Sequence, residues 1–275
     1  MRTTKVYRSI SLAIAAGIFS AGFMSCTGKQ EKKGKPAVAE EEIRQEIQKY
    51  TYPLPSAFEL TNMLNRIEAG YIAGISNDPT KAEDYFSEKD KAVNLGIYAA
   101  DLAYATTYNQ KSEVTAYFDA CETLVRELDF TEAFSQDLPG QIEGNLDNKD
   151  SLINLVSGMF ENAYSYLNSQ GRTEVSYLVL TGTAVEGLYL TTHISENAFQ
   201  NPKLIEAVLF QKEPLLKLEK MMENFKDAGL IRDAYTYVRQ INAIYAMEEG
   251  STSMTENQVK KLTEAVSAIR NELVK

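Results

Sequence analysis

The chain has 275 residues, a formal net charge of −10, and 44% hydrophobic and 24% charged residues, which is the composition of a folded globular protein. The single histidine excludes zinc sites built from several histidines, and the two cysteines exclude a framework of disulfides. The excess of acidic residues argues against nucleic acid as a partner, because nucleic acid selects clustered Lys and Arg side chains.

Residues 1–25 have the pattern of a bacterial secretion signal. Basic residues precede an uncharged apolar run over residues 9–23, which is shorter than the roughly 18–20 residues of a comfortable membrane span. The run ends in Phe23-Met24-Ser25-Cys26, which resembles the lipobox of bacterial lipoproteins, with Phe23 in place of the usual aliphatic residue. The resemblance implies that Cys26 is acylated and becomes the first residue of the mature chain. The alternative is an ordinary secretion signal that ends near a cysteine by chance.

A lipid on Cys26 would hold the protein at a bacterial membrane in the cell envelope, with its domain in the periplasm or at the cell surface. Residues 26–39 contain no large aliphatic residue except Val38, and this composition predicts a solvated tether. Residues 40–275 are assigned to one domain. Cys121 lies in a helical pattern that turns it toward the core of this domain, so we expect a small buried side chain rather than a nucleophile.

The sequence of the domain predicts helices throughout, since no segment alternates polar and apolar residues for long. Helix-start signals occur at Ser56, Ser87, Asn201 and Thr255. The predicted helices lie near residues 40–50, 56–76, 88–108, 112–129, 149–170, 173–195, 202–228, 231–249 and 255–274. Pro214 is expected to break or kink the helix over 202–228, because proline lacks the N–H that a helix interior needs. The segment 131–147 contains no predicted helix.

Two segments of the domain match without gaps. Residues 99–108 match residues 184–193 and pair Asp101 with Glu186, while the preceding helices match more weakly, 67–71 with 160–164. The matches predict an internal duplication, and the alternative is coincidence among helices rich in Ala and Tyr. We therefore expect one all-α, multi-helix domain with two related helical halves, about 56–129 and 149–228, plus a C-terminal helical pair.

In both halves, an acid is followed three residues later by a tyrosine on the same helix face. Asp101 is the only charge between residues 92 and 108, and Glu186 is the only charge between residues 175 and 195, so we expect both to be buried. A buried carboxylate needs a partner or a proton, and the candidate cations are Arg66, Arg232 and Arg239. The candidate binding residues are Glu68, Tyr71, Asp101, Tyr104, Glu161, Tyr164, Glu186, Tyr189 and His193.

Two interpretations of these residues stay open. In the first, the acids bond Tyr and Arg side chains and fix the register of the helices. In the second, some acids converge on a pocket for a cationic ligand or a metal. The pattern faintly resembles ferritin-like bundles, but tyrosine stands where their Glu-x-x-His motif has histidine, which argues against a di-iron site.

We expect no catalytic residue, no metal and no cofactor. The predicted role is a ligand-binding, partner-binding or scaffold domain of an envelope lipoprotein, and the alternative is an enzyme or metal-binding protein that uses the acid and tyrosine pairs. The expected partners are the membrane, through the N-terminal lipid, and either an envelope protein or a small ligand.

Overall fold

A computed structural model of the chain describes residues 57–66, 69–194, 200–246 and 253–275. These residues form ten α-helices and no β-strand, which confirms the all-α prediction. The α-helices are α2 (Ala57–Arg66), α3 (Glu88–Thr107), α4 (Lys111–Glu127), α5 (Leu138–Gly144), α6 (Lys149–Ser169), α7 (Thr173–His193), α8 (Pro202–Phe210), α9 (Lys212–Met222), α10 (Arg232–Ile244) and α11 (Glu256–Leu273). The 3-10 helices are η1 (Pro79–Asp84), η2 (Thr131–Ala133) and η4 (Glu223–Phe225). The predicted signal peptide with Cys26, the tether and the helix over 40–50 lie outside the described residues.

Side chains cap three of the helices at the predicted positions. The Ser87 hydroxyl accepts a hydrogen bond from the backbone N–H of Asp90 at 3.0 Å at the start of α3. Asn201 caps α8 in the same way, and Thr255 forms a reciprocal capping box with Gln258 at the start of α11. Each cap satisfies backbone donors that the first helical turn leaves free, which is why these starts could be predicted locally.

The predicted helix over residues 56–76 is wrong in its second half. α2 ends ten residues before the predicted end, and residues 69–78 are irregular. Gly74 has a φ of +76°, a left-handed conformation that glycine adopts without steric penalty. Tyr71 therefore lies outside any helix, and the prediction that Glu68 and Tyr71 share one helix face is wrong for Tyr71. Glu68 itself lies outside the described residues.

The predicted helix over residues 202–228 is divided, in agreement with the expected break near Pro214. α8 and α9 meet at Gln211, and Pro214 lies in the first turn of α9, where its missing N–H costs little. The segment 131–147, which contains no predicted helix, forms η2 and α5.

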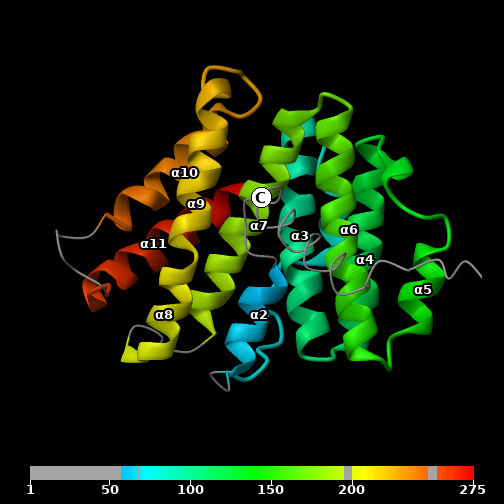
Figure 1. Cartoon of the computed structure of the whole chain (residues 1–275), viewed down its shortest axis with the longest axis horizontal. Helices are drawn as coiled ribbons and strands as arrows, with labels where there is room; N and C mark the ends of the chain where they lie inside the picture. Colours follow the sequence, from blue (N-terminus) through cyan, green and yellow to red (C-terminus); the bar gives the residue numbers. More distant parts are fainter. Residues whose placement is uncertain (1–56, 67–68, 195–199, 247–252) are drawn as a thin grey trace, which may run out of the picture. The chain divides into compact units, whose positions relative to one another are not determined.

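α3 and α7 lie side by side at the centre of the described helices (Figure 1). α4 and α6 pack on one side of this pair, and α8 to α11 pack around the other side of α7. Every residue of α3 from Ala92 to Thr107 is buried, and so is every residue of α7 from Leu180 to Leu188. The prediction that both apolar helices are buried is confirmed.

Two glycines bring α3 and α7 into close contact. A Cβ atom added at Gly96 would lie 2.0 Å from the Val179 carbonyl oxygen, and one added at Gly182 would lie 1.9 Å from the Val93 carbonyl oxygen. The Thr183 hydroxyl joins the same helices by donating to the Gly96 carbonyl oxygen at 3.1 Å. Both positions require glycine, because backbone atoms occupy the space of a side chain. Each helix thus places a glycine against a carbonyl group of the other, which is an arrangement that a duplicated pair of helices would produce. The duplication itself stays a prediction.

Candidate functional site

One face of α3 holds the irregular segment 69–78. The Tyr104 hydroxyl accepts from the backbone N–H of Ile72 at 2.9 Å, and the Tyr108 hydroxyl donates to the carbonyl oxygen of Ala69 at 2.8 Å. These polar contacts replace the backbone hydrogen bonds that a helix would have supplied. The α3 side chains that bind this segment are spaced three or four residues apart and share one face. They are Tyr98, Asp101, Tyr104 and Tyr108.

Tyr71 joins this face from within the irregular segment. Its ring stacks on that of Tyr104, with 5.1 Å between the ring centroids and 26° between the planes. Its hydroxyl donates a hydrogen bond to the carboxylate of Glu113 on α4. Tyr71 and Tyr104 are therefore brought together, and both are used in packing and hydrogen bonds within the chain.

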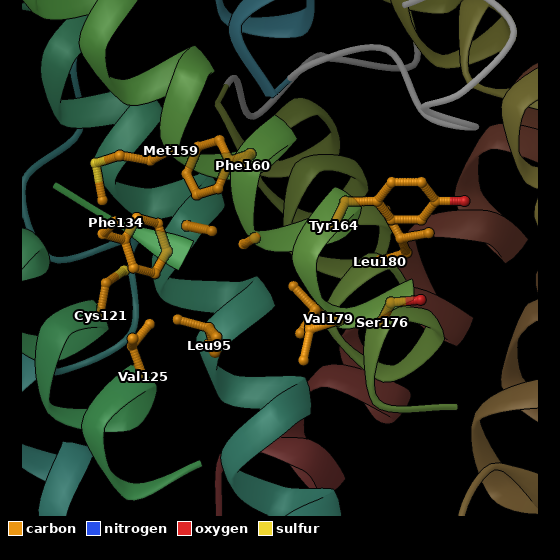
Figure 2. Close-up of a pocket in the computed structure, with 13 residues that line it drawn as sticks. Leu95, Cys121, Val125, Phe134, Met159, Phe160, Tyr164, Ser176, Val179 and Leu180 are labelled. Atoms are coloured by element: carbon orange, nitrogen blue, oxygen red, sulfur yellow. The ribbon is translucent and has the colours of Figure 1, made fainter. Parts of the chain in front are cut away.

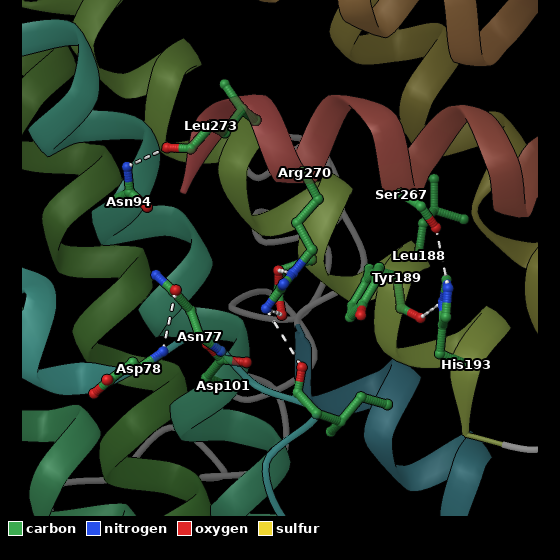
Figure 3. Close-up of polar contacts among 12 residues, drawn as sticks. Asn77, Asp78, Asn94, Asp101, Leu188, Tyr189, His193, Ser267, Arg270 and Leu273 are labelled. Atoms are coloured by element: carbon green, nitrogen blue, oxygen red, sulfur yellow. Dashed lines mark hydrogen bonds and ion pairs between the residues drawn. The ribbon is translucent and has the colours of Figure 1, made fainter. Parts of the chain in front are cut away.

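Glu186 forms a buried ion pair with Arg270 of α11. The Glu186 side chain is fully buried, and its two oxygens accept from Nε and Nη2 of Arg270 at 2.6 and 3.0 Å. The Arg270 guanidinium also lies over the ring of Tyr189, 4.1 Å from its centroid (Figure 3). A bidentate pair of this kind fixes the direction as well as the distance between two helices. We call Asp101, Glu186 and Arg270 the acid–arginine cluster.

Asp101 is the second buried acid of the cluster. Its Oδ2 accepts from the backbone N–H of Asn77 at 3.1 Å, while its Oδ1 has no hydrogen-bond partner in the structure (Figure 3). Burial, and then the negative charge of Glu186, raise the pKa of Asp101 well above its usual range, and the nearby Ser76 hydroxyl and Arg270 act in the opposite direction. Burial also raises the pKa of Glu186, but its bonds to Arg270 favour the charged form. These directions favour a cluster in which Asp101 holds a proton, Glu186 is negative and Arg270 is positive.

The cation of this cluster is one that sequence reasoning missed. Arg232 and Arg239, which were candidates, are solvent-exposed, and the side chain of Arg66 lies outside the described residues. Arg270 follows Val266 by four residues and so continues the apolar face of α11. An arginine at a core position of an amphipathic helix is the signal that could have found it.

His193 connects α7 to α11. Its ring stacks on Tyr189, its Nδ1 lies 2.9 Å from the Tyr189 carbonyl oxygen, and its Nε2 lies 3.0 Å from the Ser267 hydroxyl (Figure 3). Burial, and then Arg270, lower the pKa of His193, so the neutral ring donates from Nδ1 to the Tyr189 carbonyl oxygen. Its Nε2 faces the Ser267 hydroxyl, which donates to the Thr263 carbonyl oxygen at 2.7 Å. A serine beside a histidine also occurs in hydrolases. Ser267 lies inside α11, where the backbone N–H groups form helix hydrogen bonds and cannot stabilise an oxyanion.

The remaining predicted pair lies on α6. Glu161 and Tyr164 are half-buried, and neither supplies a hydrogen bond to the acid–arginine cluster described above. Tyr164 instead lines an apolar cavity together with Leu180 (Figure 2). Within the described residues, no three His, Cys, Asp or Glu side chains are placed to hold a metal ion.

α4, η2, α5 and α6 surround a pocket of about 460 Å³, which we call the outer pocket. Its volume lies within the range of small-molecule sites, roughly 300–1,000 Å³. The polar residues of its wall are solvent-exposed and mark its mouth: Glu122, Thr131, Glu132, Ser135 and Gln136. The apolar part of its wall is buried or half-buried, and consists of Phe118, Cys121, Val125, Phe134, Leu138 and Met159.

A smaller space of about 30 Å³, the inner cavity, lies deeper between α3, α4, α6 and α7. Four residues line both spaces, namely Cys121, Val125, Phe134 and Met159. Figure 2 shows Phe134 in the wall of the inner cavity, beside Cys121 and Met159. The inner cavity reaches α6 and α7 and is apolar except for the hydroxyls of Tyr164 and Ser176 and the Cys121 thiol.

The outer pocket lies where the sequence predicted no helix, and sequence reasoning missed it. A usable signal was present, because apolar residues recur every four positions through this segment: Phe130, Phe134, Leu138, Ile142 and Leu146. Cys121, at the pocket wall, is a free and buried thiol, as predicted, and burial raises its pKa.

The chain was compared with protein-family models, curated proteins and solved structures, and none of them matches. None of the described helices is both long enough and apolar enough to cross a membrane.

Proposed function

We propose that this protein is a lipid-anchored binding protein of the bacterial cell envelope, which holds a small ligand in the outer pocket. The observation that carries the proposal is the pocket itself, about 460 Å³ in volume, with an apolar wall and polar residues at its mouth. Pockets of this size and composition are the usual sites of small ligands. The proposal assigns no reaction to the protein.

The acid–arginine cluster supports the same assignment by exclusion. Asp101 and Glu186 have no solvent exposure, and their carboxyl groups accept hydrogen bonds from the backbone of Asn77 and from Arg270. A ligand could reach them only if α11 and the segment 69–78 moved away. The cluster therefore fits the interpretation in which the acids fix the helices, and the pocket is the better candidate for binding.

The N-terminal sequence supports the proposed location. The lipobox-like residues 23–26 follow a short apolar run, which is the order expected for an acylated cysteine. The net charge of −10 would repel anionic lipid headgroups, so a lipid on Cys26, rather than the surface of the domain, would attach the protein to a membrane.

Binding is tested with Nile red, a neutral dye whose emission rises in apolar surroundings. The chain is produced from residue 26 onward with Cys26→Ser, so that it needs no signal cleavage. Leu138→Arg places a charge in the half-buried wall of the outer pocket, and Leu216→Arg places the same charge on α9, where the leucine is 38% exposed. We expect saturable binding by the parent chain and the Leu216→Arg variant, and its loss in Leu138→Arg at an unchanged thermal midpoint. Equal binding by both variants, or no saturable binding at all, would refute the pocket as a site.

The anchor is tested separately in cells. The Cys26→Ala variant should leave the membrane fraction or accumulate as uncleaved precursor. Processed, membrane-bound protein in that variant would show that the lipobox resemblance is accidental, without affecting the pocket.

A further inference from the structure

We infer that the ligand of the outer pocket is an amphiphile with an unbranched apolar chain, which displaces the Phe134 ring and enters the inner cavity, and with a head that is neutral or cationic. The inference rests on the proposed function and adds the chemical class of the ligand. Three observations carry the inference: the wall that the two spaces share, the small volume of the inner cavity along α6, and the charge at the mouth of the outer pocket.

Phe134 is one of the four residues that line both spaces, and we assign its ring as the partition between them. It is half-buried, and it lies in the short segment between η2 and α5 rather than inside a helix. Its ring packs against Phe130, with 6.1 Å between the centroids. Its contacts in the two cavities are with apolar side chains, so an apolar chain that takes its place restores contacts of the same kind. Displacement therefore breaks no side-chain hydrogen bond.

The inner cavity is small for the length of helix that lines it. Met159, Ala163 and Leu167 line it from one face of α6, at intervals of four residues. Eight residues of helix extend about 12 Å, so the cavity follows α6 over two turns. Its free volume of about 30 Å³ is too small for a ring system, and a chain that replaces the Phe134 ring fits its shape better.

The far end of the inner cavity offers no site for a second polar group. α7 contributes one polar side chain to this end, that of Ser176, and its hydroxyl already donates to the Thr173 carbonyl oxygen at 2.8 Å. A chain that ends in a methyl group therefore suits this end, because a buried polar group without a partner is costly.

The mouth selects against an anionic head. Glu122 and Glu132 line it, and none of the residues that line the outer pocket is Lys or Arg. Glu132 is held in place by a hydrogen bond from the Tyr166 hydroxyl. Arg126 lies one turn from Glu122 on α4, and its guanidinium donates to the Thr123 hydroxyl at 3.4 Å. The two glutamates would repel a carboxylate head, whereas they would attract an ammonium head and would not repel a hydroxyl head.

The experiment uses the variant Phe134→Trp, because the chain has no tryptophan and the new indole reports on the partition alone. The probes share one chain and differ in the head: dodecyltrimethylammonium, dodecanol and dodecanoate. The two ionic probes are used below their micelle concentrations, and dodecanol is used below its solubility limit. We expect the first two to shift the indole emission and dodecanoate to bind about tenfold more weakly. The double variant Glu122→Gln/Glu132→Gln should remove most of that difference. Equal or tighter binding of dodecanoate would overturn the assignment of the head.

A second variant tests the path of the chain. Ala163→Leu fills the inner cavity beside α6, where Ala163 is 7% exposed. We expect it to weaken binding of the dodecyl probe and to leave a hexyltrimethylammonium probe unaffected, because the shorter chain ends in the outer pocket. Unchanged binding of both probes, with a normal thermal midpoint, would overturn entry into the inner cavity.

These outcomes separate the inference from the function on which it rests. If Nile red binds and Leu138→Arg abolishes that binding, while no dodecyl probe binds, the ligand class is wrong and the pocket remains a site. If Nile red does not bind either, the proposed function fails as well.

Discussion

Two regions around α3 and α7 differ in how their buried groups are satisfied. In the polar region, Asp101 and Glu186 meet Arg270 and the backbone of the segment 69–78 through directed hydrogen bonds. In the apolar region, the outer pocket and inner cavity leave space between side chains that form no such bonds at their shared wall. Both regions contain residues from the same α-helical bundle.

The difference shows where the fold can accept a ligand. Hydrogen bonds and ion pairs in a buried site depend on geometry, so the polar region resists any rearrangement. Dispersion contacts have little directional preference, so a side chain such as Phe134 can be exchanged for another apolar group at small cost. The polar region then serves as the rigid support, and the apolar region serves as the adaptable part.

The largest effect is expected when the ion pair is broken. Arg270→Met leaves Glu186 buried without its cation, and this should lower the free energy of unfolding by about 3–5 kcal/mol. Urea denaturation of the parent chain and the variant measures the change. Arg239→Met is the control, because its side chain is 63% exposed and its 3.7 Å contact with Glu219 should contribute less than about 1 kcal/mol. Equal losses in the two variants would show that the buried pair is no stronger than a surface pair.

A smaller loss is expected at the contact of the central helices. Gly96→Ala places a Cβ atom against the Val179 carbonyl, so α3 and α7 must separate, and the free energy of unfolding should fall by about 1–3 kcal/mol. Gly158→Ala on α6 is the matched control. A Cβ atom there meets nothing within 4 Å, and the higher helix propensity of alanine should stabilise the chain by up to about 1 kcal/mol. Stabilisation by both substitutions would contradict the close contact.

The third prediction concerns the dependence of stability on pH. The pKa of Asp101 is raised in the folded state, so above its unfolded value of about 3.9 the folded chain keeps a proton that the unfolded chain loses. The contribution of Asp101 to stability therefore falls as pH rises, by at most about 1.4 kcal/mol per pH unit. Asp101→Asn removes this contribution and keeps an oxygen for the Asn77 N–H.

Denaturation of the parent chain and Asp101→Asn between about pH 4 and pH 8 measures the difference. We expect the variant to gain stability relative to the parent as pH rises. If the variant instead lost stability relative to the parent as pH rises, Asp101 would have to be charged in the folded chain. The negative charge of the cluster would then not lie on Glu186.

The smallest effect should appear in the reactivity of Cys121. Its thiol is buried and its pKa is raised, so it should react with a disulfide reagent much more slowly in the folded chain than in urea. Because Cys121 lines both cavities, a bound apolar ligand should slow the reaction further, by a factor of a few. The rate is followed on chain that carries Cys26→Ser. Labelling that is equally fast in the folded and unfolded chain would contradict the burial of this wall.

Local signals predicted most of the helices. Ser87 and Thr255 satisfy backbone donors within their own first turns, so the starts of α3 and α11 follow from neighbouring residues alone. The end of α2 could not be predicted in this way. The segment 69–78 is held by side chains of α3, and such long-range hydrogen bonds leave no pattern in the local sequence.

The candidate site was predicted in part. The lone acids of two apolar helices, Asp101 and Glu186, indicated a buried polar cluster, because a buried charge needs compensation wherever the chain folds. The identity of the cation depended on which distant helix packs against α7, and Arg270 was therefore missed. The four-residue recurrence of apolar residues over 130–146 could have indicated a packed helical segment. The outer pocket itself depends on how η2 and α5 pack against α4 and α6, and a periodic pattern does not show the space that this packing leaves.

The position of Arg270 in the chain has a consequence for the order of folding. Its partner Glu186 is synthesised 84 residues earlier, and Asn94 of α3 bonds a carbonyl of α11 that is synthesised 179 residues later. While a ribosome has released only the chain through α7, the central helices lack both contacts and keep their acids in water. We therefore expect the core to form only after α11 has been synthesised.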